Sequence, residues 1–341
     1  MAITIKDIAK AVGVSPSTVS RTCNDHPGIS EKTKNKIRKA MEELGYVPNF
    51  QAKNLVNRSS NTIGIVLPMT EQHTYQNTFY LEVIHGISQC CNQNKYMNTI
   101  ITGNSENELF ENVLSGINSG KIDAFILLYS KKDDKIIKYL DDNSFPYILI
   151  GKPMYNIEKT SFVDNDNILA GKDATNYLIK LGHRRIMFFY NKSSYVFEQD
   201  RKIGYMAGLV ENGIEYDSKL VVEGDKIKDK EMKYFKKIFS GNNIPTAIIT
   251  TDDISALKIE KILLSLNFNI PSDVSIIAFN NSLISNLTSP RLTVIDINNY
   301  QLGYQASEQI IFHLLQKSST ATKVIVSHSL VERESCKKIF D

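Results

Sequence analysis

The chain lacks an apolar run long enough to span a membrane, and no hydrophobic export segment stands at its start. Cysteine is scarce as well: the 341 residues contain only four, without C-x-x-C spacing, namely Cys23, Cys90, Cys91 and Cys336. This scarcity argues against a disulfide framework, and the six histidines do not stand at zinc-ligand spacing from these cysteines. We therefore expect a cytoplasmic protein that holds no metal and no cofactor.

The signatures of nucleotide binding and of common hydrolases are also missing. The sequence contains neither G-x-x-x-x-G-K-[ST] nor G-x-G-x-x-G, and it has no G-x-S-x-G elbow. Residues 164–167 alternate carboxylates and amides in the manner of a calcium loop, but the glycine and the distant glutamate of such a loop are absent. No nucleophile, base and orienting group can be assembled, so the sequence predicts that the chain is not an enzyme.

Positive charge, by contrast, is concentrated in one part of the chain. Residues 1–60 contain ten lysines and arginines against five aspartates and glutamates, whereas the whole chain has a net charge of only +3. Such a basic segment is typical of a module attracted to the phosphate backbone of nucleic acid. Five of its cations are expected on the outward face of one helix: Lys32, Lys34, Lys36, Arg38 and Lys39.

Residues 4–24 (TIKDIAKAVGVSPSTVSRTCN) predict two short helices joined by a tight turn. The first helix has apolar residues at i, i+3, i+4 and i+7, which are Ile5, Ile8, Ala9 and Val12. Thr4 precedes it, with Asp7 three positions later at capping-box spacing. Gly13 breaks this helix, and Ser15-Pro16 supplies the cap and the first residue of the next. Two helices joined in this way form a helix-turn-helix, whose second helix reads the major groove of DNA.

The second helix carries the residues that suit this task. Val19 faces inward, whereas the outward positions are small and polar apart from Arg21. Arg21 can donate to the O6 and N7 atoms of guanine, and short hydroxyl side chains reach phosphates. The candidate DNA contacts of this region are Thr4, Ser15, Pro16, Ser17, Thr18, Ser20, Arg21 and Asn24. The alternative is a small helical subdomain with a polar face and no DNA partner.

A third helix is expected to support these two. Ser30 would cap it and Gly45 would stop it. Its buried stripe is predicted to consist of Ile37, Ala40, Met41 and Leu44.

Beyond residue 61 the sequence alternates apolar runs with amphipathic stretches. Runs of strand length occur at 63–67, 97–101, 124–128 and 147–150, and again at 186–190, 220–222, 247–250 and 274–279. Helical stretches such as 81–91, 109–117, 169–181 and 254–266 lie between them. This alternation predicts parallel sheets flanked by helices, arranged as two doubly wound α/β lobes. Ligands bind outside the carboxyl ends of such strands, so the cleft between the lobes is the expected site.

The whole chain resembles the LacI/GalR family of transcriptional repressors. The resemblance rests on residues 1–60 and on the segments 46–68 (YVPNFQAKNLVNRSSNTIGIVLP), 163–186 (VDNDNILAGKDATNYLIKLGHRRI), 199–209 (QDRKIGYMAGL), 270–282 (IPSDVSIIAFNNS), 289–298 (SPRLTVIDIN) and 330–335 (LVERES). It implies a helix-turn-helix head at 1–47, a hinge helix and linker at 48–61, and a core at 62–341 with the fold of periplasmic sugar-binding proteins. The N-terminal lobe would comprise about 62–160 and 292–321, and the C-terminal lobe about 161–291 and 322–341.

The same resemblance gives the hinge a function. Asn49, Ala52 and Leu55 occupy hinge positions of the family, which implies a short helix that folds only on DNA. In a dimer Leu55 would enter the minor groove at the operator centre, where apolar wedges unstack a base step and kink the duplex. The alternative is an ordinary flexible linker, because residues 57–61 are polar and loop-like.

Candidate ligand contacts follow from the resemblance and from the predicted strand ends. Arg201, in a D-R-x-x-G element, resembles the family's arginine that binds sugar hydroxyls, and a guanidinium offers five fixed donors. Three aspartates follow predicted strands and could accept from hydroxyls: Asp166, Asp252 and Asp253. Asn280 stands where many members of the family have an aspartate, so this pocket need not bind the same pattern of hydroxyls.

Aromatic residues near the expected cleft could stack on sugar rings. They are Phe79, Tyr80, Tyr129, Phe197 and Phe279. Structural alternatives stay open for these candidates, since an aspartate after a strand is often a helix cap and a phenylalanine is more often part of the core.

These features predict a repressor that binds operator DNA as a homodimer and releases it when a small sugar binds between the lobes. The segments 77–80 (NTFY), 279–282 (FNNS) and 296–298 (DIN) are most similar to maltose-operon repressors of Gram-positive bacteria, which implies maltose or a maltodextrin as effector. Another sugar, a purine or a phosphoprotein partner stays open. A secreted sugar-binding protein or a cytoplasmic sugar enzyme would have no use for Arg21 on a reading helix. No heptad helix follows residue 335, which favours a dimer over a tetramer.

Overall fold

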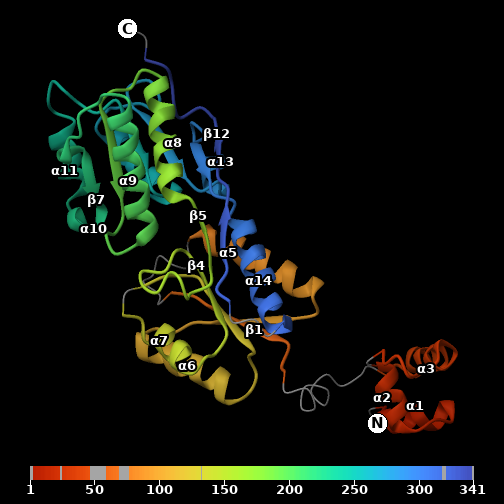
Figure 1. Ribbon diagram of the computed structural model, residues 1–341. Helices are drawn as coiled ribbons and strands as arrows, with labels where there is room; N and C mark the ends of the chain where they lie inside the picture. The colour runs from red at the N-terminus through yellow and green to blue at the C-terminus, as the bar shows by residue number, and fades with distance from the viewer. Residues whose placement is uncertain are drawn as a thin grey trace. The chain divides into compact units, whose positions relative to one another are not determined.

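The computed structural model describes residues 3–23, 25–46, 59–68, 77–131, 133–316 and 320–339. The chain divides into two compact units, Met1–Ser60 and Asn61–Asp341. We call them the head and the core and describe each separately. Figure 1 draws the helices of the head in red and the core in colours from orange to blue.

The head folds as the helix-turn-helix that the sequence predicts. Its helices are α1 (Ile5–Val12), α2 (Pro16–Cys23) and α3 (Glu31–Glu43). They enclose a small core whose fully buried members are Ile8, Ala9, Val19 and Ile37. Gly13 ends α1 in the left-handed conformation, with φ 76°, which costs glycine little because it has no Cβ.

The prediction for α3 is right about its start and wrong about one residue of its buried face. Ser30 caps the helix by accepting a hydrogen bond from the backbone nitrogen of Thr33 at 3.3 Å. Leu44, which is predicted to be buried, is 40 % exposed. Because α3 ends at Glu43, Leu44 is already the C-cap, and Gly45 then turns the chain away with φ 64°.

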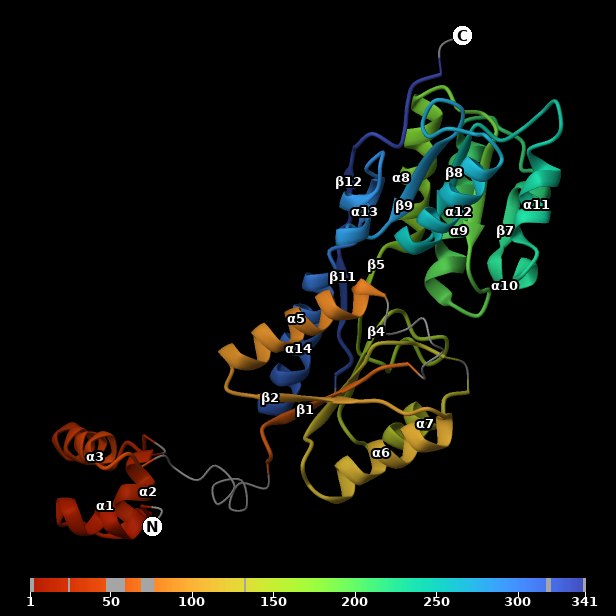
Figure 2. The ribbon, with the colours of Figure 1, turned by 180° about the vertical axis from the view of Figure 1, so that it is seen from behind.

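The core contains two six-stranded sheets, which we call sheet N and sheet C (Figure 1, Figure 2). Sheet N has the order β11-β5-β4-β3-β1-β2, built from β1 (Thr62–Val66), β2 (Met97–Ile101), β3 (Ala124–Leu127), β4 (Tyr147–Ile150), β5 (Phe162–Asn165) and β11 (Lys323–Val326). Sheet C has the order β12-β10-β9-β8-β6-β7, built from β6 (Ile186–Tyr190), β7 (Val221–Glu223), β8 (Ala247–Thr250), β9 (Ser275–Phe279), β10 (Thr293–Asp296) and β12 (Ser329–Val331). Neighbouring strands run parallel, except that β12 runs antiparallel to β10. The two predicted doubly wound sheets are confirmed.

Helices cover both faces of each sheet, and each sheet with its helices forms one lobe, lobe N or lobe C. Sheet N is packed by α5 (Thr78–Gln93) and α14 (Asn299–Gln316) on one face and by α6 (Glu106–Asn118) and α7 (Lys135–Asp142) on the other. Sheet C is packed by α8 (Asn167–Lys180) and α9 (Val196–Glu211) on one face and by α11 (Glu231–Ile238) and α12 (Asp253–Ser265) on the other. The short helices α10 (Gly224–Ile227) and α13 (Leu283–Leu287) and the 3-10 turn Ser218–Leu220 lie in connections. Because both faces are covered, central strands such as β3 and β9 are buried along their whole length.

The chain crosses between the lobes after β5, after β10 and after β11. The lobe boundaries predicted near residues 160, 291 and 321 are therefore too early, because each of these strands completes one sheet before the chain leaves it. The side-chain amide of Asn165 joins the three crossovers. It donates to the carbonyl oxygen of Ile297 at 2.9 Å and to that of Val326 at 2.8 Å.

Candidate functional site

The outward face of α2 presents small polar residues and one arginine. Its exposed residues are Pro16, Ser17, Ser20 and Arg21. Ser15 caps the helix by accepting from the backbone nitrogen of Thr18 at 3.1 Å, and its hydroxyl lies 2.9 Å from the hydroxyl of Thr18 and 2.7 Å from that of Ser17. The guanidinium of Arg21 makes no hydrogen bond or ion pair with the described residues of the head. The donors of its guanidinium are thus not committed to any of them.

The other predicted contacts of the head are placed differently. Thr4 donates to the carboxylate of Asp7 through its hydroxyl at 2.7 Å and through its backbone nitrogen at 2.8 Å, which lowers the pKa of Asp7. Thr4 is exposed, and its hydroxyl oxygen can still accept a hydrogen bond. The four remaining candidates, Asn24, Asn49, Ala52 and Leu55, lie outside the described residues.

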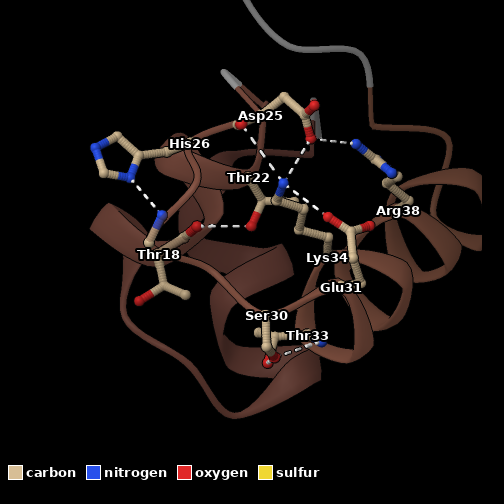
Figure 3. A network of polar contacts seen from close by, with 10 residues as sticks. Thr18, Thr22, Asp25, His26, Ser30, Glu31, Thr33, Lys34 and Arg38 are labelled. Atoms are coloured by element: carbon tan, nitrogen blue, oxygen red, sulfur yellow. Dashed lines mark hydrogen bonds and ion pairs between the residues drawn. The ribbon is translucent and has the colours of Figure 1, made fainter.

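The basic face predicted for α3 is wrong at Lys34. This side chain is 5 % exposed, and its ammonium forms ion pairs of 2.9 Å with both Asp25 and Glu31 (Figure 3). Lys34 stands three residues before the buried Ile37, so it shares the inner side of the helix. Arg38 also pairs with Asp25, at 2.8 Å. Lys34 is thus the one buried member of the predicted set, whereas Lys32, Lys36, Arg38 and Lys39 are exposed.

In the core, Arg201 on α9 is the centre of a buried polar network. The side chain is 3 % exposed, and this burial lowers its pKa to about 10. Its Nε donates to Oδ1 of Asn167 at 2.9 Å, and its Nη1 donates to the carbonyl oxygen of Thr251 at 2.7 Å. The guanidinium carbon lies 4.0 Å from the ring centre of Phe279 and 4.9 Å from that of Phe197. Three of the predicted ligand residues, Arg201, Phe197 and Phe279, therefore lie together in a cation–π arrangement.

Two glycines allow α8 and α9 to approach closely enough for these contacts. A Cβ on Gly171 would lie 2.2 Å from the carbonyl oxygen of Arg201. A Cβ on Gly204 would lie 2.0 Å from the carbonyl oxygen of Ile168. No side chain fits at either position without moving backbone, so the glycines fix the distance between the two helices and with it the position of Arg201.

A buried aspartate that the sequence analysis does not select orients Asn167. Asp164 accepts from the side-chain amide of Asn167 at 3.0 Å and from the backbone nitrogen of Lys152 at 3.0 Å. Since Asp164 takes the amide nitrogen, the amide oxygen of Asn167 faces Arg201. Burial raises the pKa of Asp164 to about 6.

Asp166, the residue of this segment that the sequence analysis does select, is a helix cap. It is exposed and accepts from the backbone nitrogen of Leu169 at 2.9 Å at the start of α8. The carboxylates close enough to Arg201 to act on its pKa are Glu198, Asp164 and Asp252. Asp166 thus caps α8, which is the alternative that the sequence leaves open beside a ligand role.

Asp252 and Asp253 follow β8 and have different surroundings. Asp252 caps α12 by accepting from the backbone nitrogen of Ser255 at 2.6 Å, and it also accepts from the amide of Asn191. Asp253 is fully buried, which raises its pKa to about 6, and it accepts from the hydroxyl of Ser282. Its Oδ1 is buried and finds no donor among the described residues.

Asn280 follows β9 directly after Phe279. It is 5 % exposed and adopts a left-handed conformation with φ 74°. Its Oδ1 is buried and, like that of Asp253, has no donor within the described part of the chain. Two acceptors without donors therefore lie at the carboxyl edge of sheet C, where Phe279 ends β9 and Arg201 of α9 contacts Thr251.

Glu198 is a further functional candidate that the sequence does not reveal, because one glutamate in an amphipathic helix resembles a solvated position. It is 1 % exposed and accepts from the backbone nitrogens of Asn191 at 3.0 Å and Lys192 at 2.6 Å. It also accepts from the hydroxyl of Thr251 at 2.8 Å. Burial raises its pKa to about 7. Glu198 thus ties the loop after β6 to the strand end that holds Arg201.

The remaining aromatic candidates lie in separate places. Phe197, which is 37 % exposed, stacks on Tyr195 with ring centres 5.6 Å apart. Phe79 and Tyr80 meet edge to face at 5.3 Å in the first turn of α5, and burial and the proximity of Tyr195 raise the pKa of Tyr80. Tyr129 packs into the apolar cluster between sheet N and α6 and α7. Tyr195 of lobe C thus lies close enough to Tyr80 of lobe N to act on its pKa, whereas Tyr129 is half-buried against the core of lobe N.

Within the described ranges, no three histidine, cysteine, aspartate or glutamate side chains come together as a possible metal site. Nor does any helix in those ranges combine the length and the apolar character needed to cross a bilayer. A surface hollow of about 340 Å³ lies near the amino ends of β6 and β8, where His183, Thr246 and Lys337 line it. Its lining includes no predicted ligand residue, and ligands of doubly wound sheets bind at the opposite ends of the strands.

Two family descriptions match the sequence, one for each unit. "Bacterial regulatory proteins, lacI family" matches residues 4–49, and "Periplasmic binding proteins and sugar binding domain of LacI family" matches residues 60–334. The HTH-type transcriptional regulator MalR of Streptococcus pneumoniae is 33 % identical over 340 residues, which cover 98 % of this chain and 100 % of that protein. The chain belongs to the LacI family.

Solved structures of LacI-family proteins share this fold. The probable maltose-operon transcriptional repressor MalR of Staphylococcus aureus superposes with a TM-score of 0.75 at 34 % identity, covering 81 % of this chain and 98 % of that one. The transcriptional regulator CelR in complex with cellobiose superposes with a TM-score of 0.74 at 27 % identity, covering 98 % of this chain and 99 % of that one.

This LacI-family protein is a DNA-binding transcriptional repressor. Repressors of the family bind operator DNA, take sugar effectors and form dimers. The match at residues 4–49 contains α1, α2 and α3, and the match at 60–334 contains Arg201 and the polar residues around it. The relatives named above are transcriptional regulators.

Proposed function

We propose that a small sugar controls this repressor by binding between the lobes against Arg201. The observation that carries the proposal is the set of uncommitted polar atoms at the carboxyl edge of sheet C. Arg201 gives two hydrogen bonds to described residues and has five donors, while Asp253 and Asn280 each have a buried oxygen without a donor. A sugar hydroxyl donates and accepts at once, so a polyol satisfies both kinds of group. A purely apolar ligand would leave the buried oxygens unpaired, at a cost in free energy.

Within the sugars, the aromatic residues favour one with flat apolar faces. Phe197 and Tyr195 form a partly exposed stack beside Arg201, and Tyr80 approaches from lobe N. Glucose units linked in a chain present such faces to aromatic rings. The MalR of Staphylococcus aureus is described as a probable maltose-operon repressor, and CelR was solved with the disaccharide cellobiose. We therefore propose maltose or a maltodextrin as the effector.

In the head, we propose that α2 lies in the major groove of the operator. Arg21 would contact a guanine, and Ser15, Ser17, Thr18 and Ser20 would contact phosphates or base edges. Asn24 would contact DNA together with these residues. Asn49, Ala52 and Leu55 keep the hinge roles that the family resemblance gives them, with Leu55 in the minor groove. The proposal treats residues 48–61 as the hinge between head and core.

The proposed mechanism has two states and no chemical step, so the chain acts as a regulator and not as an enzyme. Without sugar, a homodimer places two reading helices on a near-palindromic operator. Sugar favours a different arrangement of the two lobes, in which the hinges no longer pair on DNA. By linkage, operator and sugar weaken the binding of each other by the same factor.

The decisive experiment is a titration of the full chain on DNA of its own promoter, at fixed salt, with maltose, maltotriose, glucose or ribose. Release by maltose or maltotriose alone would support the proposed effector. If the chain stays tightly bound to the promoter in the presence of each of the four sugars, the proposed effector is wrong. The search would then turn to co-repressors and protein partners. The Arg201→Met variant should bind the promoter normally and lose the response, whereas Arg184→Met, an exposed arginine of the same lobe, should keep it.

A further inference from the structure

The reading helix α2 ends in an unusual cap. The backbone nitrogen of His26 donates to the carbonyl oxygen of Arg21 at 2.9 Å, and that of Asp25 donates to the carbonyl oxygen of Thr22 at 3.0 Å. These paired bonds form a Schellman motif, in which glycine most often takes the left-handed position. Here that position is occupied by Asp25, with φ 52°. An aspartate in this conformation has a backbone cost that the surrounding structure must offset.

Lys34 of α3 holds this aspartate in place (Figure 3). Its Nζ lies 2.9 Å from Oδ1 of Asp25 and 3.5 Å from the carbonyl oxygen of the same residue, so it contacts both the side chain and the backbone of the cap. The third donor of the ammonium points to Oε1 of Glu31 at 2.9 Å. Arg38 donates to the same Oδ1 of Asp25 at 2.8 Å.

This geometry leaves Lys34 no part in phosphate binding. An ammonium has three donors and all three have acceptors in the head. Hydrogen bonds with Glu31 and Asp25 raise the pKa of Lys34, so the ammonium stays charged. Its charge is paired with these two carboxylates of the head. Lys36, by contrast, is exposed on the same helix and can reach solvent.

We propose that Lys34 is a positioning residue for DNA reading. By holding Asp25 in the left-handed conformation it ends α2 at Cys23 and fixes the last turn of that helix, the turn that carries Arg21. This inference rests on the proposed reading role of α2. Lys34 touches no DNA; its effect reaches the operator through the geometry of the helix end.

The test compares two duplexes: one selected from a random-sequence pool with the wild-type full chain, and a scrambled version of it. Lys34→Met should lower the affinity for the selected duplex by roughly tenfold, the range of one base contact, and leave the affinity for the scrambled duplex unchanged. The dependence of affinity on salt should keep its slope. The matched control Lys36→Met should weaken binding to both duplexes and reduce the salt slope by about one unit.

A rescue separates this role from a general loss of stability. Glycine adopts the left-handed conformation unaided, so the double variant Asp25→Gly, Lys34→Met should regain the discrimination that Lys34→Met loses. If Lys34→Met does not fold, a comparison of Asp25→Asn with Asp25→Ala tests the inference in its place. Both variants remove the carboxylate, and of the two new residues only asparagine tolerates the left-handed region. The alanine variant should then discriminate less well than the asparagine variant.

Three results would overturn the inference. They are a reduced salt slope in Lys34→Met, a folded double variant without recovery, and equal discrimination by Asp25→Asn and Asp25→Ala. Circular dichroism of each full-length variant establishes that it is folded. A wild-type chain that selects no duplex would instead refute the proposed reading role of α2, so the two failures are distinguishable.

Discussion

Arg21 is the one long side chain on the exposed face of α2, so we expect the proposed reading of sequence by this helix to depend on it more than on any of its serines. Arg21→Ala should cost roughly 1–3 kcal/mol of operator binding and relax the preference at one base pair in each half-site. Competition with operators substituted one base pair at a time would measure both effects. An equal loss on random DNA would mean that Arg21 contacts phosphate and reads no base.

Glu198 gives the core a pH dependence whose sign follows from its burial. Its pKa in the folded chain is raised to about 7 from an ordinary value of 4.5, so the folded chain binds this proton more tightly than the unfolded chain does. The free energy of unfolding should therefore fall as the pH rises from about 4.5 to about 7. Glu198→Gln removes this ionisation and should remove that part of the decrease, on the order of 3 kcal/mol.

Urea unfolding at pH 5 and at pH 8 measures this effect. Tyrosine fluorescence is a suitable signal, because the chain has no tryptophan and only Tyr46 of its 16 tyrosines lies in the head. The exposed Glu158 provides the control, since Glu158→Gln should leave the slope as it is. A wild-type slope unchanged by Glu198→Gln would show that the carboxyl group titrates alike in the folded and unfolded chain.

Single residues also mark the limit of what the sequence predicts. Arg21 and Arg201 could be found because each stands in a local pattern, a helix-turn-helix and a D-R-x-x-G element. Glu198 and Lys34 could not, since a charged residue on an amphipathic helix is usually solvated. Their burial depends on partners brought in by other elements, such as the loop after β6 and the cap after α2, and no spacing within one helix encodes those partners.

At the scale of elements, the close approach of α8 and α9 is the feature on which the proposed effector site depends. Gly204→Ala would place a methyl group 2.0 Å from the carbonyl oxygen of Ile168 and force the helices apart. We expect a loss of about 1–3 kcal/mol in core stability, as for other overpacked positions. Because Arg201 moves with α9, the sugar concentration needed to release the operator should rise as well.

Val210→Ala, at an exposed position of α9, is the matched control and should change neither quantity by much. Thermal unfolding and the maltose titration measure them in the same preparations. If Gly204→Ala lowered stability and left the sugar response intact, the helix contact would be structural only and Arg201 would tolerate its displacement.

Helices and strands were the most predictable elements, because caps and apolar periods act within a few residues. Ser30 and Gly13 bound their helices as expected. Asp166 and Asp252 show the corresponding weakness: an aspartate between a strand and a helix serves equally as cap and as ligand, and both aspartates cap. Which of several polar strand ends keeps an unpaired oxygen, as Asp253 and Asn280 do, depends on the neighbouring strands and is not local.

At the scale of the whole molecule, the sequence predicts two lobes and misplaces the points where the chain passes between them. The cause is that β5, β10 and β11 are short strands, and the sheet to which each belongs is determined by its partner strand. These partners are β4, β9 and β5, and the last of them is distant in sequence from β11. Such pairing is set by the final arrangement of the sheets and leaves no period in the sequence. The hydrogen bonds that join the crossovers are therefore visible only in the structure.

Any change in the arrangement of the two lobes must bend all three crossovers, and Asn165 joins them through its two bonds of 2.9 and 2.8 Å to Ile297 and Val326. Asn165→Val removes both donors and leaves two carbonyl oxygens without this partner. If the crossovers must move together to transmit sugar binding, this variant should bind the operator normally while the factor by which sugar weakens operator binding falls toward one. Operator titrations with and without saturating maltose measure that factor. Asn212→Val, an exposed asparagine at the end of α9, should keep the wild-type factor. An unaltered factor in Asn165→Val would mean that the crossovers bend independently and that the coupling is carried by the contacts of the sugar itself.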